Sequence, residues 1–170
     1  RGGAGHPEFG ADGGHRGGVL MAGSAYSGGR RLRHAARWLA PVAWMAVIFA
    51  LSSRPADELD GMLPLFQRFI PGMTDFNWGH YAAYFILALT FEFAIGAASR
   101  RPLVKAAVVL ACLLYGVTDE YHQSFVAGRV PDPLDLRNDG IGAAAAVCFT
   151  ALPGVRRIWR KLPGQTNFDT

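Results

Sequence analysis

The sequence predicts an all-α fold, an integral membrane bundle of four transmembrane helices with the N- and C-termini in the cytoplasm. Three observations lead to this prediction. The composition is 51% hydrophobic and only 18% charged, which is too apolar for a disordered chain and too weakly charged for a typical soluble domain. Four apolar runs follow a Gly-rich beginning. Clusters of Lys and Arg flank these runs on alternate connections.

Residues 1–34 are expected to form a disordered, Gly-rich tail with a basic end. Residues 1–29 show no apolar periodicity, and their glycine content makes ordering them costly in entropy. The chain does not begin with Met, and Met21 lies just before the first informative segment, so residues 1–20 are interpreted as an upstream extension or a fragment edge. The expected membrane domain covers residues 35–155, and a basic cytoplasmic tail covers residues 156–170.

A helix of about 20 residues spans a bilayer core about 30 Å thick, and the first two apolar runs are long enough to form such helices. Run 38–51 carries no charge, and its Pro41 lies in the first turns, where a missing amide costs little. Run 78–98 has full length but contains Glu92, a carboxylate that is costly in a membrane unless neutral or paired. Lys105 is its expected partner.

The remaining two runs are shorter. Run 103–117 reaches full length if the helix continues through the polar residues 118–124. Run 141–152 is the weakest, because few of its side chains favour insertion into a membrane. Its Gly and Ala residues form a surface that lets another helix approach closely, so packing is expected to hold it in place. Cys112 and Cys148 lie inside apolar runs and are interpreted as buried small hydrophobic residues.

The positions of the basic residues predict the orientation. Four alternating helices bring all three basic clusters to one side, which the positive-inside rule assigns to the cytoplasm. These clusters comprise Arg30, Arg31, Arg33, Arg37, Arg100, Arg101, Lys105, Arg156, Arg157, Arg160 and Lys161. The other two connections are rich in Asp and Glu and are expected to face outward. Attraction to anionic membrane lipids accounts for the basic clusters, so no nucleic acid partner is expected.

Polar side chains gather at the outward ends of the predicted helices. Ionisable residues at membrane depth are costly and usually functional, so these residues form the candidate binding site. They are His80, Tyr84, Asp119, Glu120, Gln123, Arg129, Asp135 and Asn138. Helical spacing places Asp119 and Glu120 next to Gln123. Pro131 and Pro133 are expected to fix an extended stretch before the fourth helix.

The order of these motifs resembles the VanZ-like membrane proteins over roughly residues 38–152. The matching residues are His80 and Tyr84, the set Asp119, Glu120 and Gln123, the pair Gly128 and Arg129, the set Asp135, Asn138, Gly140 and Gly142, and Leu51, Ser52, Ser53 and Pro55. The resemblance implies a small multi-pass protein of the cell membrane, in a family whose named member is associated with low-level teicoplanin resistance. Members often carry a Lys three residues before the His. Asn77 stands there in this chain, so a less cationic site is expected.

Three functions remain open. The first is recognition of a polar or anionic headgroup, with a lipid-linked envelope intermediate or a glycopeptide as partner and Arg129 as a planar hydrogen-bond donor. The second is an enzyme acting on a lipid-linked substrate, with His80 or Glu120 as general base and Ser124 as the nearest nucleophile. The third is a structural network in which Glu120, Arg129, Asp135 and Asn138 satisfy one another.

Neither a metal site nor a cofactor is expected. A set formed by Asp119, Glu120, His122 and Asp135 lacks the two-His spacing of a zinc-binding helix. The chain shows no nucleotide-binding loop or dinucleotide fingerprint. The sequence therefore favours a membrane protein with a polar outward site and leaves catalysis open.

Overall fold

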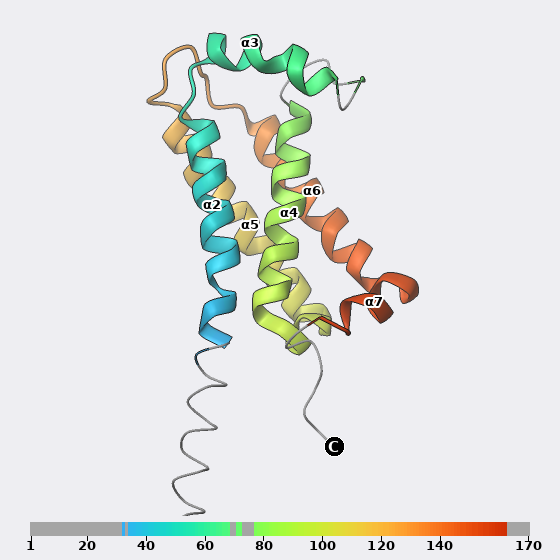
Figure 1. Cartoon of the computed structure of the whole chain (residues 1–170). Helices are drawn as coiled ribbons and strands as arrows, with labels where there is room; N and C mark the ends of the chain where they lie inside the picture. The colour runs from blue at the N-terminus through green and yellow to red at the C-terminus, as the bar shows by residue number, and fades with distance from the viewer. Residues whose placement is uncertain (1–31, 33, 69–70, 73–76, 163–170) are drawn as a thin grey trace, which may run out of the picture. The chain divides into compact units, whose positions relative to one another are not determined.

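A computed structural model describes residues 32, 34–68, 71–72 and 77–162, and its regular elements are all helices. In chain order they are α2 (Leu39–Ser52), α3 (Ala56–Gln67), α4 (Asn77–Ile95), the 3-10 helix η1 (Gly96–Arg100), α5 (Pro102–Gln123), α6 (Pro133–Ala151) and α7 (Pro153–Trp159) (Figure 1). These helices belong to one compact unit that begins at Arg37. The predicted disordered tail lies outside the described residues except for positions 32 and 34, as does the end of the predicted basic tail.

The long helices α2, α4, α5 and α6 form a bundle around α4. Helix α4 packs against each of the other three, and α5 also packs against α2 and α6. The buried core contains aromatic and aliphatic side chains on α4, α5 and α2 and small ones on α6. Its members are Ile48, Tyr84, Leu87, Ala88, Val108, Cys112, Ala143, Ala146 and Val147. The predicted all-helical class is confirmed over the described residues.

Helix α6 is held by close packing, as the small-residue surface predicts. A Cβ atom on Gly142 would meet the backbone carbonyl of Tyr81 on α4 well inside van der Waals contact. The backbones of the two helices therefore approach closely, and only glycine allows this distance. Cys112 is buried as expected, but Cys148 is exposed, because it lies on the face of α6 that turns away from this packing.

Three helical stretches have the length and apolarity needed to cross a membrane. They are His34–Ser52, Trp78–Arg100 and Pro102–Gln123. The stretch Pro133–Ala151 joins them only if it is combined with Pro153–Trp159, from which it is bent by 84°. Leu152 precedes Pro153 and has an extended ψ of 135°, so proline ends the helix here. The fold is thus a helical bundle with three or four candidate membrane spans, and the fourth predicted span is the broken one.

The structure corrects the boundaries of the predicted fourth helix. Helix α6 begins at Pro133, not at residue 141, so Pro133 is helical rather than extended. The side chain of Asp132 caps this helix by accepting a hydrogen bond of 2.8 Å from the amide of Leu134. Proline is well tolerated directly after such a cap. The first turns of α6 therefore carry the polar residues that were expected to precede it.

Helix α3 was not predicted, since residues 56–67 were interpreted as a connection. Asp57 and Glu58 lie in its first turn, where negative charge favours a helix start. In Figure 1 it runs across the direction of α2 and α4, beyond the end of α2. We call this end of the bundle, where α2 and α5 finish and α4 and α6 begin, the α3 end. The opposite end, which holds η1 and α7, is the α7 end.

Candidate functional site

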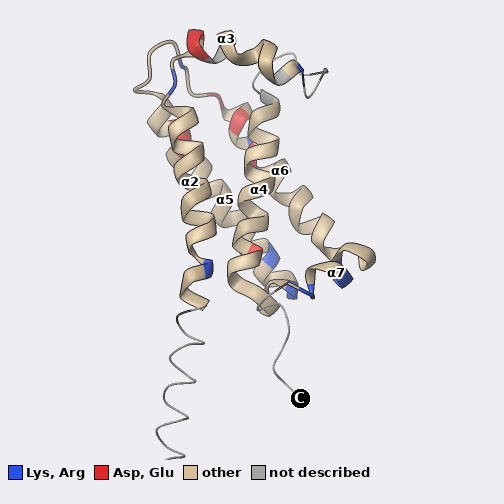
Figure 2. Cartoon of the chain, viewed as in Figure 1, with Lys and Arg blue, Asp and Glu red and all other residues tan. Residues whose placement is uncertain are grey.

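Most of the Asp and Glu side chains of the bundle lie at the α3 end. Figure 2 shows Asp and Glu concentrated there, whereas Lys and Arg dominate the α7 end. The topology explains this grouping, because the start of α4, the end of α5 and the start of α6 meet at one level of the bundle. His80 on α4 thus comes close to Asp135 and Asp139 on α6, which are far from it in sequence.

His80 is oriented by a buried carboxylate. Its Nδ1 lies 2.9 Å from Oδ1 of Asp139, whose side chain has no exposed surface. An ionised carboxylate only accepts hydrogen bonds, so Nδ1 carries the proton and donates it. The other ring nitrogen, Nε2, lies 3.6 Å from Oδ2 of Asp135, and it presents a lone pair when the ring is neutral. Asp139 is not among the candidate site residues named from the sequence.

Glu120 and Asp135 lie beside His80. Oε2 of Glu120 accepts a hydrogen bond of 2.9 Å from the amide of Asp132, while Oε1 is buried without a partner. Oδ1 of Asp135 is also buried without a partner. His80, Glu120 and Asp135 each offer a ligand atom, and these atoms all lie within 4.8 Å of one another. Two carboxylates this close repel each other unless a proton or a cation lies between them.

Three further polar side chains of the predicted site, Asp119, Gln123 and Tyr84, are buried. Asp119 is 3% exposed, and its Oδ2 accepts a hydrogen bond of 3.3 Å from Nε2 of Gln123. This confirms the expected contact between Asp119 and Gln123, whereas Glu120 turns toward Asp132 instead. Tyr84 is 1% exposed and its hydroxyl has no hydrogen-bond partner. Tyr84 is therefore a core residue with a buried polar tip.

Asn138 is linked to α4 through Tyr81, which is not among the site residues predicted from the sequence. The Tyr81 hydroxyl donates a hydrogen bond of 2.6 Å to Oδ1 of Asn138, and this oxygen also accepts one of 3.3 Å from Arg137. Tyr81 follows His80 directly, at the start of the second predicted helix. Its position next to a candidate site residue could have indicated it as a further hydrogen-bonding residue. The link adds a second polar contact between α4 and α6.

Arg129 forms no ion pair with the carboxylates of the α3 end or with any other described acidic residue. Its Nε is buried without a partner. Gly128 before it has a φ of +74°, a left-handed conformation that suits glycine, in the turn after α5. No hydrogen bond joins any two of Glu120, Arg129, Asp135 and Asn138. The third function left open from the sequence, a network in which these four residues satisfy one another, is therefore not supported by their hydrogen bonds.

The two remaining residues that the sequence analysis considered for chemistry lie outside the cluster. His122 stacks on Phe49 with ring centroids 4.2 Å apart, and its Nε2 is 3.0 Å from the hydroxyl of Ser53. The Ser124 hydroxyl donates to the carbonyl of Tyr121 at 2.6 Å. His122 thus tethers α5 to α2, and Ser124 is not directed at a base.

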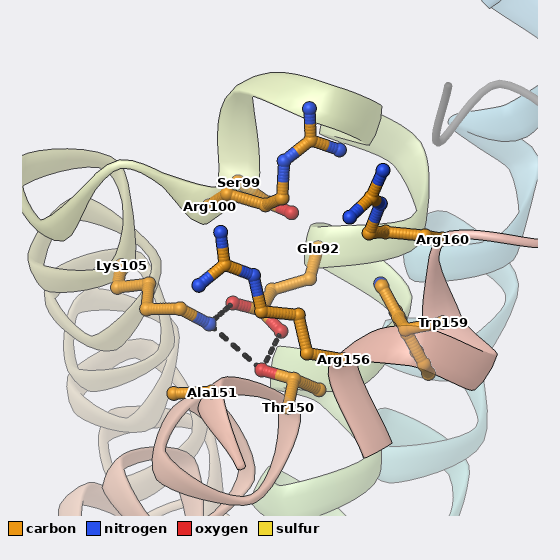
Figure 3. A pocket seen from close by; sticks show the side chains of 9 residues that line it. All are labelled: Glu92, Ser99, Arg100, Lys105, Thr150, Ala151, Arg156, Trp159 and Arg160. Atoms are coloured by element: carbon orange, nitrogen blue, oxygen red, sulfur yellow. Dashed lines mark hydrogen bonds and ion pairs between the residues drawn. The ribbon is translucent and has the colours of Figure 1, made fainter. Parts of the chain in front are cut away.

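A second polar group lies at the α7 end. Nζ of Lys105 donates to Oε1 of Glu92 at 2.5 Å and to Oγ1 of Thr150 at 2.7 Å, which confirms the expected pairing of Glu92 (Figure 3). The cavity next to this network has a volume of about 50 Å³. Its lining consists of Glu92, Ser99, Arg100, Lys105, Thr150, Ala151, Arg156, Trp159 and Arg160. The predicted binding site contains none of these residues.

The comparison with known proteins adds one match. A family model described as VanZ/LLP1 matches residues 37–153, which is more than half of the chain. The matched region includes α2 to α6 and every residue of the polar cluster at the α3 end. No curated protein and no solved structure shows significant similarity to the chain.

Proposed function

The chain belongs to the VanZ-like family, and we propose that its α3 end faces outward from the cell membrane and binds the polar headgroup of an envelope intermediate. Through this binding the protein affects susceptibility to glycopeptides such as teicoplanin. The observation that carries the proposal is the cluster of His80, Glu120 and Asp135, in which two buried carboxylate oxygens have no partner. Such groups are costly in a membrane protein unless a ligand uses them.

The charge distribution supports the proposed orientation. Arg100, Lys105, Arg156 and Arg160 lie at the α7 end, around the cavity of Figure 3. Basic residues favour the cytoplasmic side of a membrane, where anionic lipids attract them. The acidic α3 end then faces the cell envelope, which is where glycopeptides and the precursors they bind are found.

The chemistry of the cluster favours some headgroups over others. Carboxylates accept hydrogen bonds from hydroxyl, amide and ammonium groups, so the proposed ligand presents such donors. An anionic headgroup would be repelled by Glu120 and Asp135, since Arg129 forms no ion pair with either. A phosphate would therefore need a cation between itself and these carboxylates.

The first test is the teicoplanin sensitivity of a susceptible host that expresses the wild type, Glu120→Gln or Arg129→Ala. Matched controls are Glu58→Gln, an exposed carboxylate on α3, and Arg68→Ala, an exposed arginine after α3. We expect Glu120→Gln to lose resistance while it accumulates in the membrane like its control. If the wild type gives no protection, the link to glycopeptides is wrong. If Glu120→Gln protects fully, the site is elsewhere.

The second test measures the orientation. Cys148 is exposed and is first replaced by Ser, and Cys112 is buried. A single cysteine is then introduced at Val130, which is 82% exposed at the α3 end, or at Leu103, which is 85% exposed at the α7 end. A membrane-impermeant thiol reagent should label Val130→Cys in intact cells and Leu103→Cys only after lysis. The reverse pattern would overturn the proposed orientation.

A lipid-modifying enzyme is the second candidate, because one observation favours it. Asp139 orients His80 and leaves Nε2 available, which is the arrangement of a general base. Ser124 is not placed as a nucleophile, so the attacking group in such a reaction would be water. Incubating the purified protein with a lipid-linked precursor and separating the products tests this candidate. Unchanged precursor, at protein concentrations that bind it, would exclude the enzyme.

A further inference from the structure

We propose that His80, Glu120 and Asp135 bind a divalent metal ion of the zinc class at the α3 end. The three side chains come from α4, α5 and α6, and their candidate ligand atoms lie within 4.8 Å of one another. Metal ligands about 2.0–2.2 Å from a common Zn²⁺ lie roughly 3–4 Å apart, so small side-chain adjustments complete the site. The ion would occupy the same carboxylate oxygens as the proposed headgroup, and it would be the cation that a phosphate needs at this site.

The surroundings of His80 are those of a metal ligand. Histidines that bind metals usually donate their other ring N–H to a carboxylate or carbonyl, which fixes the ring and raises its basicity. Asp139 provides this carboxylate at 2.9 Å from Nδ1 and is completely buried. The nitrogen that faces Glu120 and Asp135 is therefore Nε2. Gly116 makes room for Asp139, since a Cβ at this position would lie 2.6 Å from its Oδ2.

Each of the two carboxylates also has an oxygen available for a metal ion. One oxygen of Glu120 is held by the amide of Asp132 at 2.9 Å, which leaves Oε1 available for an ion. Oδ1 of Asp135 is likewise buried without a hydrogen-bond partner, in a side chain that is 14% exposed. Among the described residues, no Lys or Arg forms an ion pair with Glu120 or Asp135. A bound cation would compensate the negative charge of these two carboxylates, which no Lys or Arg of the described residues does.

The donor set indicates which ion binds. Ca²⁺ takes six to eight oxygen ligands and Mg²⁺ keeps most of its waters, so an imidazole among three protein ligands suits neither. One imidazole and two carboxylates suit Zn²⁺, which binds more tightly than Mn²⁺ to such a set. Three protein ligands leave one coordination position open. This position would take water or an oxygen atom of a bound headgroup.

The test uses the full chain, purified in detergent on a tag without histidine, stripped with a chelator and titrated with ZnCl₂ or CoCl₂. We expect one Zn²⁺ per chain by elemental analysis and visible Co²⁺ absorption that Zn²⁺ abolishes. His80→Ala and Asp135→Asn should lose this binding. Asp139→Asn should weaken it by about 10–100-fold, the usual effect of losing an outer-shell partner. His122→Ala and Glu58→Gln are the matched controls and should bind like the wild type.

Two outcomes would overturn the proposal. One is a wild-type protein that binds no stoichiometric Zn²⁺ or Co²⁺, whatever the variants do. The other is binding that persists in His80→Ala, which would assign the ion to other histidines such as those of the N-terminal tail. If Asp139→Asn fails to accumulate, Glu120→Gln replaces it, because this variant keeps the side-chain volume and the contact between His80 and Asp139. Retained binding in Glu120→Gln would also count against the three-ligand site.

Discussion

Nδ1 of His80 lies 2.9 Å from Oδ1 of Asp139, so a buried carboxylate of α6 holds an imidazole of α4 in a fixed orientation. The two helices also pack against each other in the core, where Gly142 of α6 lies against the backbone of Tyr81 on α4. The polar pair therefore joins the two helices that pack most closely. Its strength determines both the position of His80 and part of the stability of the bundle.

A double-mutant cycle measures this strength. We expect His80→Ala and Asp139→Ala to be coupled by about 1–3 kcal/mol, because each single change leaves a buried polar group without its partner. The measurement is chemical or thermal unfolding of the four proteins in detergent. His122 and Asp139 make no contact with each other and serve as the control pair, with an expected coupling below about 0.5 kcal/mol. Equal coupling in both pairs would refute the structural role of the contact.

Gly142→Ala should destabilise the bundle. The added Cβ would collide with the carbonyl of Tyr81, which is backbone and cannot move aside without separating α4 from α6. Overpacking of this kind costs about 1–3 kcal/mol. Gly79→Ala is the matched control, since nothing lies within 4 Å of its added Cβ and alanine favours a helix. Comparison of the unfolding midpoints checks the prediction, and an unchanged midpoint for Gly142→Ala would contradict it.

The long apolar runs were enough to predict the membrane helices. Some features that depend on contacts between helices, such as the partner of His80, could not be predicted from the sequence. Glu92 and Lys105 were paired correctly because a carboxylate inside an apolar run demands a partner near its level. The partner of His80 was missed, because Asp139 lies 59 positions away and only the packing of α6 against α4 brings the two side chains together. Helix α3 was missed because its short run, with Pro64 inside it, lacks the length of a membrane span.

Two hydrogen bonds from aromatic side chains should contribute to the attachment of α2. Nε1 of Trp44 donates to the carbonyl of Ala83 at 2.8 Å, and the Tyr115 hydroxyl donates to the carbonyl of Met45 at 2.7 Å. Trp44→Phe and Tyr115→Phe should each lower the free energy of unfolding by about 0.5–1.5 kcal/mol. Each variant loses the hydrogen bond, while the phenyl ring still fills most of the space of the original side chain. Tyr121→Phe, whose exposed ring lies at the end of α5, is the control. Stability equal to the control in both variants would show that these bonds add nothing.

Lys105→Met should destabilise the α7 end strongly, because Lys105 contributes three hydrogen bonds and the charge opposite Glu92. Its Nζ donates to Glu92, to Thr150 and to the carbonyl of Val147 at 3.0 Å, and the Glu92 side chain is 1% exposed (Figure 3). Removing one member of a buried ion pair costs about 3–5 kcal/mol, since the other charge stays buried. Adding Glu92→Gln to Lys105→Met should recover part of this loss, because the negative charge that Lys105 balances is then removed as well. Lys161→Met, an exposed basic residue after α7, should leave stability unchanged. Unfolding of the four proteins in detergent tests the prediction, which is wrong if the double variant is less stable than Lys105→Met alone.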